Sequence, residues 1–141
     1  MSVREGYRSV SAYLVSSDAR AIKAFAEKVF GAAEVQPPTE DDGRLVHVAL
    51  AIGDSVVLLG QPPEGTPPMT AFLHVYVDDA AAVHAKAVAA GAVSLMPPAP
   101  QPHGDVAGMV RDMGGNAWWI AQYVEDVPED EMLRRMKASQ T

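Results

Sequence analysis

The sequence predicts an α+β protein built from two tandem βαβββ modules and a C-terminal helix. One observation is a repeat: the stretch from Tyr13 to Pro38 returns from Leu73 to Pro98 at one constant offset. The other is that, in each copy, extended segments with alternating apolar residues flank a helical segment. The identical residues at this offset include Asp18 with Asp78, Gly31 with Gly91, and Pro37-Pro38 with Pro97-Pro98. Because two copies of a long unit do not form a repeat array, we expect two halves that pack as pseudo-symmetric partners.

The first module is expected to place one amphipathic helix among four strands. Asp18 is a suitable N-cap, and Gly31 stands where a left-handed residue ends a helix. The letters TEDDG at 39–43 predict a polar turn, and Gly53-Asp54 predicts a hairpin turn. The expected elements are a helix over 19–30 and strands over 7–15, 32–36, 44–52 and 55–60.

The second module repeats this order. Its helix is expected to begin at Asp78 or Asp79 and to end at Gly91, with His84 on its solvent side. Residues 97–104 are expected to form a loop, and Asp112 is expected to set the turn DMGG by an ion pair with Arg111 or an Asx-type bond. The expected strands cover 71–77, 92–96, 105–111 and 116–123.

The remaining segments are a linker and a tail. The letters QPPEGTPP from Gln61 forbid regular structure, and Asp126 is expected to cap a final helix with Met132, Leu133 and Met136 on one apolar stripe. Within one compact domain, the expected units are a first module over residues 1–62, a linker over 63–70, a second module over 71–124 and a helical tail over 125–141.

Composition excludes several classes of protein. Of the 141 residues, 48% are hydrophobic and 21% are charged, which is typical of a globular protein with a substantial core. The absence of cysteine excludes disulfides, thiolate catalysis and cysteine zinc sites, and it fits a cytoplasmic protein. No apolar run approaches the roughly 20 residues that span a bilayer, so no membrane partner is expected. The net charge of -7 argues against nucleic acid and favours a neutral or cationic small ligand.

An ordered set of stretches gives the chain a family resemblance: YLVSSDARAIKAFAEKVFGA, HVALAIGDSVVLL, FLHVYVDDA, GMVRDMGGNAWWIA and VEDVPEDEM. With the doubled βαβββ unit, they make the chain resemble the vicinal oxygen chelate superfamily, which includes glyoxalase I, extradiol dioxygenases, fosfomycin-resistance enzymes and bleomycin-binding proteins. The sequence is most similar to the glyoxalase-like group described as similar to 3-demethylubiquinone methyltransferase. The resemblance implies curved mixed sheets around a cavity, and a homodimer.

The resemblance also locates the positions that hold a metal ion in metal-dependent members. In this chain they map to Ser11, Val57, Phe72 and Trp119. None of these residues is a good ligand for a divalent ion, so we expect neither a metal nor another cofactor. An improvised site from His47 and His74 is the open alternative.

Three histidines are candidate acid–base or ligand-contacting groups: His47, His74 and His103. His47 and His74 lie mid-strand, where each would shuttle a proton, hydrogen-bond a ligand, or simply be satisfied by backbone or water. His103 lies in the proline-rich loop, and such loops often form lids over cavities. Ser11 has no base beside it in the sequence, which argues against a nucleophilic serine.

Adjacent Trp118 and Trp119 must point to opposite faces of their strand. Because the resemblance gives Trp119 a former ligand position, we assign it to the cavity and Trp118 to the outside or to a dimer partner. Flat aromatic walls bind planar ligands by stacking, although each such residue could equally be plain core. The complete candidate ligand-binding set is Ser11, Tyr13, His47, Val57, Phe72, His74, Tyr76, His103, Met109 and Trp119.

The leading functional hypothesis is a metal-independent binding protein of the glyoxalase/bleomycin-resistance type. It would be a cytoplasmic homodimer that sequesters a planar, mostly apolar natural product or drug, in self-resistance or as a carrier. One alternative is a metal-free isomerase or lyase with His47 or His74 as general acid/base. Another is a fold with only structural or regulatory duty, and fold alone does not choose among them.

Overall fold

The computed structural model describes residues 2–140, which form three helices and two separate sheets. The predicted α+β class and the C-terminal helix are confirmed. The first module contains β1 (Ala12–Val15), α1 (Ala19–Phe30), β2 (Ala33–Glu34), β3 (Thr39–Asp41), β4 (Arg44–Ile52) and β5 (Ser55–Gly60). The second contains β6 (Phe72–Tyr76), α2 (Ala80–Ala89), β7 (Val93–Pro100), β8 (Asp105–Arg111) and β9 (Ala117–Tyr123), and α3 (Glu129–Ser139) follows it.

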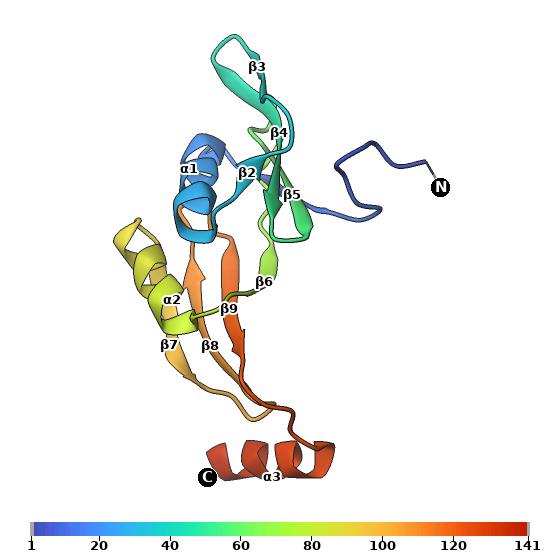
Figure 1. The fold of residues 1–141 in the computed structure, drawn as a ribbon. Coiled ribbons are helices and arrows are strands. Elements are labelled where there is room, and N and C mark those ends of the chain that lie inside the picture. Colours follow the sequence, from blue (N-terminus) through green and yellow to red (C-terminus); the bar gives the residue numbers. More distant parts are fainter. Residues whose placement is uncertain (1, 141) are drawn as a thin grey trace.

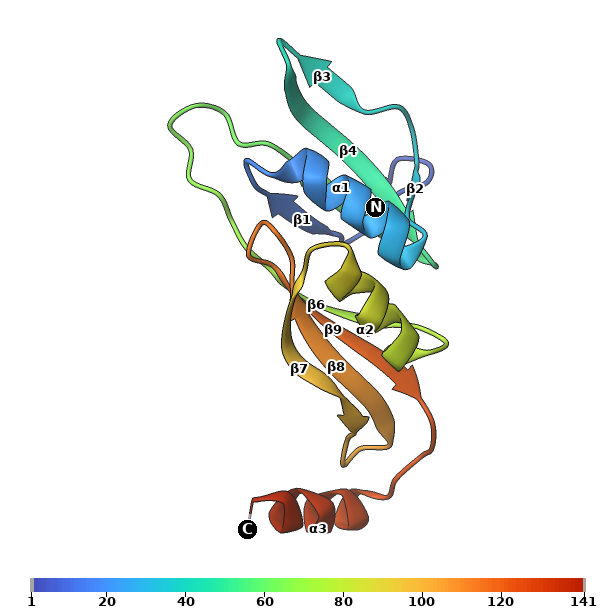
Figure 2. The ribbon, with the colours of Figure 1, turned by 90° about the vertical axis from the view of Figure 1, so that its left-hand side faces the viewer.

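The two sheets share one strand plan, as a duplicated sequence predicts. Sheet 1 has the order β1-β5-β4-β2, with β3 also paired to β4, and sheet 2 has the order β6-β9-β8-β7. In each module the first strand runs parallel to the last, β1 beside β5 and β6 beside β9. Figures 1 and 2 show the sheets one after the other along the molecule, with α1 and α2 on the same side. We call that side of each sheet its helix side and the other its open face.

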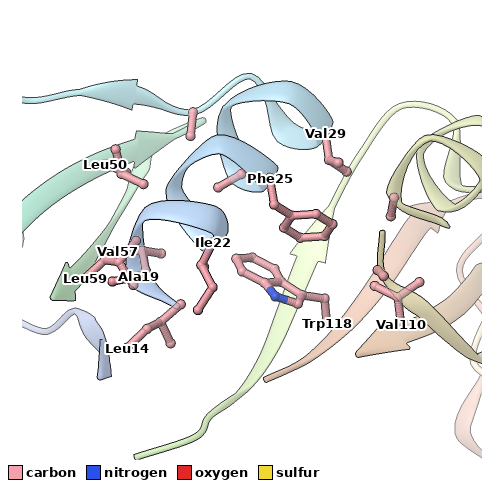
Figure 3. Packing of buried hydrophobic residues seen from close by; sticks show 14 of the residues in the cluster. Leu14, Ala19, Ile22, Phe25, Val29, Leu50, Val57, Leu59, Val110 and Trp118 are labelled. Atoms are coloured by element: carbon pink, nitrogen blue, oxygen red, sulfur yellow. The ribbon is translucent and has the colours of Figure 1, made fainter. Parts of the chain in front are cut away.

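Each helix covers the helix side of its own sheet. The apolar residues of α1 recur three and four positions apart, so they form one stripe, which packs on sheet 1 and, through Phe25, on Trp118 of the second module (Figure 3). The α2 helix is rich in alanine, which lets it lie close to β8. A Cβ atom added at Gly108 would come within 2.9 Å of the His84 ring, so this position requires glycine. The buried residues of α1 are Ala19, Ile22, Phe25, Ala26 and Val29.

Trp118 joins the two modules. It belongs to β9, yet its indole stacks on Phe30 of α1 with the ring centroids 4.8 Å apart. Phe25 of the same helix lies 6.1 Å from it (Figure 3). Trp118 is only 2% exposed. The expectation that it faces the outside or a dimer partner is therefore wrong, because α1 of the same chain covers it.

A buried carboxylate fixes the turn that precedes Trp118. Asp112 accepts hydrogen bonds from the backbone N–H groups of Gly114 at 2.8 Å and Asn116 at 3.0 Å, which confirms the predicted Asx-type bond. Its Oδ2 atom also accepts from the Trp118 indole Nε1–H at 2.8 Å. Asn116 in turn accepts from the backbone N–H of Ala71, which ties the turn to the start of β6.

Several predicted boundaries move. β1 begins at Ala12, so the extended segment before it is not a strand. Residues 39–43 are not only a turn, because β3 pairs with β4 and leaves Asp42 and Gly43 at the bend with positive φ angles. The expected loop after residue 96 is also shorter, since β7 continues to Pro100 with irregular pairing to β8. Prolines donate no ladder bond, and β7 is an edge strand, where that loss is tolerated.

The helix caps follow the predictions in part. Gly31 is left-handed with φ 68°, as predicted. The cap of α2 is Asp79, whose side chain accepts from the Ala82 N–H at 3.1 Å. Asp18 precedes α1 but makes no side-chain cap bond. The tail helix α3 begins after Pro128, so Asp126 is not its cap.

We expect Trp118→Ala to lower the free energy of unfolding by about 3–5 kcal/mol, because it empties the contact between the modules. Trp119→Ala is the matched control and should cost clearly less, since Trp119 is only half-buried. Urea denaturation of both variants measures the difference. Equal losses would contradict the assignment of Trp118 as the residue that joins the modules.

Candidate functional site

The open face of sheet 2 is an exposed surface of large side chains. Alternation places them opposite Trp118 and Val110, which face the helices. Two of them, Phe72 and Tyr76, are 65% and 60% exposed. Contiguous exposed apolar surface on a folded chain commonly marks a binding or association site. The residues are Phe72, His74 and Tyr76 on β6, Met109 on β8 and Trp119 on β9.

The centre of this face is a row across three strands. The strand register pairs His74 with Trp119, and Trp119 with Met109. The His74 and Tyr76 rings meet edge to face, with their centroids 4.8 Å apart. The structure thus brings five of the ten predicted ligand residues onto one surface, and this row can support a flat ring.

A hydrogen-bonded chain of polar groups borders the open face. The Tyr76 hydroxyl donates to Asp105 Oδ2 at 3.0 Å, and His103 Nε2 lies 3.1 Å from the same oxygen. Asp105 is 3% exposed. The hydrogen bond to the Asp105 carboxylate raises the pKa of the Tyr76 phenol, because the protonated phenol is the donor. His103 thus joins the face through Asp105.

Asp105 belongs to this site but was not among the residues predicted from the sequence. It begins a strand next to the proline-rich loop, where an acidic residue is unremarkable. Its alternation with Ala107 and Met109 on β8 was the available signal, since residues two apart share a face.

Tyr13 and His47 form a separate group on the open face of sheet 1. Their ring centroids are 5.9 Å apart. Tyr13 is 45% exposed, and the burial of its remaining part raises the pKa of its phenol. The two sheets lie end to end (Figure 2), so this pair is a second surface beside that of sheet 2.

Ser11 and Val57 line a cavity between the modules, which we call the junction cavity. It has a volume of about 810 Å³ and lies between α1, β5, β6 and the start of α2. His74 and Tyr76 also border it from β6. Val57 lies in the core on the helix side of sheet 1.

The strand register assigns one of the mapped metal positions to Leu58 instead of Val57. Tyr13 pairs with Leu58 on sheet 1 as His74 pairs with Trp119 on sheet 2. Leu58 is therefore the counterpart of Trp119, and the expected position at Val57 is off by one residue. Leucine is no better a metal ligand than valine.

Among residues 2–140, the polar side chains do not gather as a metal centre would require. Within residues 2–140, no three His, Asp or Glu side chains are arranged to hold a metal ion. His47 and His74 belong to different sheets of the chain. Metal-independence stays a prediction for binding experiments.

His84 is buried, although it was expected on the solvent side of its helix. It is 7% exposed, and its Nε2 atom lies 3.1 Å from Ser94 Oγ. Because Ser94 belongs to β7, this contact ties α2 to the edge of sheet 2. The role of His84 is therefore structural packing.

The fold and the two open faces place the chain among proteins built from two tandem βαβββ modules. Comparison with known sequences identifies the family. The sequence profile of the Glyoxalase/Bleomycin resistance protein/Dioxygenase superfamily matches residues 9–120, and the chain belongs to this superfamily. This confirms the resemblance to the vicinal oxygen chelate proteins.

Relatives resemble the chain over nearly its whole length. It is 32% identical over 143 residues to the uncharacterized protein Mb0911c of Mycobacterium bovis, covering 92% of this chain and 93% of that one. Among solved structures, TioX from Micromonospora sp. ML1 matches with a TM-score of 0.68 and 21% identity, over 82% of this chain and 98% of TioX. A glyoxalase/bleomycin resistance protein/dioxygenase family enzyme from Burkholderia phytofirmans PsJN matches with a TM-score of 0.66 and 19% identity, over 81% and 97%. The structural likenesses show the fold.

None of the helices found in residues 2–140 has the length and apolar character to cross a bilayer.

We expect Asp105→Asn to lower the pKa of Tyr76, because the variant removes the carboxylate that accepts the hydrogen bond of the protonated phenol. The raised pKa means that the Tyr76–Asp105 bond stabilises the fold below about pH 10 and is lost as the pH rises through the folded-state pKa. NMR titration of the tyrosine ring carbons, assigned with Tyr76→Phe, measures the shift. Asp126→Asn is the control and should instead lower the pKa of Tyr123, which bonds to Asp126. If the pKa of Tyr76 is the same in Asp105→Asn as in the original protein, the proposed hydrogen bond between Tyr76 and Asp105 is refuted.

Proposed function

We propose that the protein binds a planar, mostly apolar organic molecule on the open face of sheet 2, without a metal ion. The observation that carries this proposal is the row of two aromatic rings and a thioether, His74, Trp119 and Met109, flanked by the exposed Phe72 and Tyr76. A flat ligand would gain about 0.5–1.5 kcal/mol per stacked ring pair beyond the burial of its area.

Polar groups at one edge of the row would orient the ligand. The Tyr76 hydroxyl and the His103 ring are fixed by the buried Asp105, and small-molecule sites commonly combine apolar walls with a few such placed groups. The net charge of -7 disfavours anionic ligands such as phosphates. Together these features favour a neutral or weakly basic aromatic compound.

Sequestration, in self-resistance or as a carrier, is the role that we propose. The superfamily includes both binding proteins and enzymes, and its metal-dependent chemistry needs ligands that Ser11, Leu58, Phe72 and Trp119 do not supply. A chain without cysteine fits the reducing cytoplasm, where we place this activity.

Acid–base catalysis is the second candidate function, and the His103–Asp105 pair favours it. An imidazole bonded to a buried carboxylate beside a phenol is suited to moving a proton. The sequence-based candidates His47 and His74 instead contact aromatic rings. Recovery of the ligand chemically unchanged after long incubation supports sequestration, whereas turnover that His103→Ala abolishes while binding survives supports catalysis.

We expect Trp119→Ala to weaken the binding of a neutral planar probe, N-phenyl-1-naphthylamine, by about 1–3 kcal/mol. Fluorescence titration measures the affinity, and added EDTA should leave it unchanged. Tyr7→Ala is the control, because this tyrosine bonds to Gln36 in the first module, away from sheet 2. An unchanged affinity of Trp119→Ala for the probe would contradict the proposed binding site.

We also propose that a second copy of the chain covers the open faces in a homodimer. Sedimentation at micromolar concentration should then give twice the chain mass of 15.0 kDa. Phe72→Glu should weaken the dimer at least about tenfold, because burying an unpaired charge is costly. Val88→Glu, at a 43% exposed position on α2, should not weaken it. A monomer at every concentration, or equal effects of both variants, would contradict this arrangement.

A further inference from the structure

We propose that the junction cavity is a second small-molecule site, which borders the open face at His74 and Tyr76, and that it takes an amphipathic amine with a small aromatic or aliphatic body. At about 810 Å³, the cavity falls within the roughly 300–1,000 Å³ typical of ligand pockets. Its residues come from both modules, so it exists only where the two halves of the duplication meet. Three features of its lining define the ligand.

The first feature is a preformed apolar wall. Val29 and Phe30 at the end of α1, Val83 on α2 and Trp118 on β9 contribute to it. Phe30 and Trp118 are stacked, and the bond from Trp118 to Asp112 fixes the indole. A wall that is already ordered costs a ligand little conformational entropy, so it would accept the apolar body of the amine.

The second feature is a polar atom that lacks a partner. The Ser11 Oγ atom is buried without a hydrogen-bond partner within residues 2–140, and Ser11 lines the cavity. A buried hydroxyl left unpaired is costly, and its oxygen has lone pairs free to accept. An ammonium group donates only, so an amine that reaches Ser11 would supply the missing bond.

The third feature is the charge of the lining. Three aspartates, Asp54, Asp78 and Asp79, line the cavity together with one arginine, Arg8. The Asp54 carboxylate accepts a hydrogen bond from the Ser55 hydroxyl at 3.1 Å. The Arg8 Nε–H is already bonded to the carbonyl of Asp54, and the Asp79 side chain caps α2. No hydrogen bond or ion pair within residues 2–140 engages the Asp78 carboxylate, which leaves it available to a cation. The net charge of -7 also attracts a cationic ligand over a longer range.

The test uses the full chain and 2-phenylethylamine as probe, followed by NMR of the two tryptophan indole N–H signals. Trp118 reports on the junction cavity and Trp119 on the open face, and the signals are assigned with Trp119→Phe. We expect the amine to shift the Trp118 signal, and the neutral 2-phenylethanol and the anionic 3-phenylpropionate to bind at least about threefold more weakly. A shift confined to Trp119, or equal affinity for all three probes, would overturn the proposal.

Matched variants locate the cation. Asp78→Asn should weaken the amine about three- to tenfold, whereas Asp41→Asn, the same charge change on the exposed β3, should stay within about twofold. Ser11→Ala should weaken it by about threefold through the lost hydrogen bond. Val83→Trp should weaken binding, because the larger ring would occupy part of the apolar wall on which the body of the amine would lie. Equal responses to Asp78→Asn and Asp41→Asn would refute the assignment of the cation site. The proposed function would be unaffected by that result as long as binding of N-phenyl-1-naphthylamine depends on Trp119.

Discussion

The burial of Trp118 against α1, with its indole N–H held by Asp112, is the interaction on which the rest of the structure depends. It joins a strand of the second module to the helix of the first. It also fixes the faces of sheet 2, because a one-residue slip in a strand exchanges its two sides. Once Trp118 points toward the helices, Trp119 and its cross-strand neighbours must lie on the open face.

The same constraint gives the two adjacent tryptophans different chemistry. Trp118 is buried in the contact between the modules and forms part of the wall of the junction cavity. Trp119 stands between His74 and Met109 on an exposed sheet, where only a ligand or another chain would cover it fully. A planar apolar ligand and an amphipathic amine would therefore meet opposite faces of one strand, which allows the two sites to be tested separately.

The sequence predicted the modules well, because the repeat, the stripe of α1 and Gly31 are local signals. It did not predict which side chains of a strand or helix face the packed side, because this depends on packing between distant segments. The repeat aligned Asp18 with Asp78, whereas the structure makes Asp79 the cap of α2, one residue further along. In a strand that single residue exchanges the faces, so Tyr13 corresponds to His74 rather than to Leu73. The burial of His84 was hidden for a related reason, because an alanine-rich helix has no strong polar face.

The corrected correspondence also explains why the second module is the better binding surface. The equivalent rows are Tyr13, Leu58 and Ala49 in sheet 1 and His74, Trp119 and Met109 in sheet 2. The first row is smaller at its centre and at one end, so it offers less flat area to a ring. The first module also lacks a counterpart of the His103–Asp105 pair in its contacts within residues 2–140. In the proposed dimer, the first module would therefore act as a cover, and the second would provide the ring contacts and the polar groups that orient a ligand.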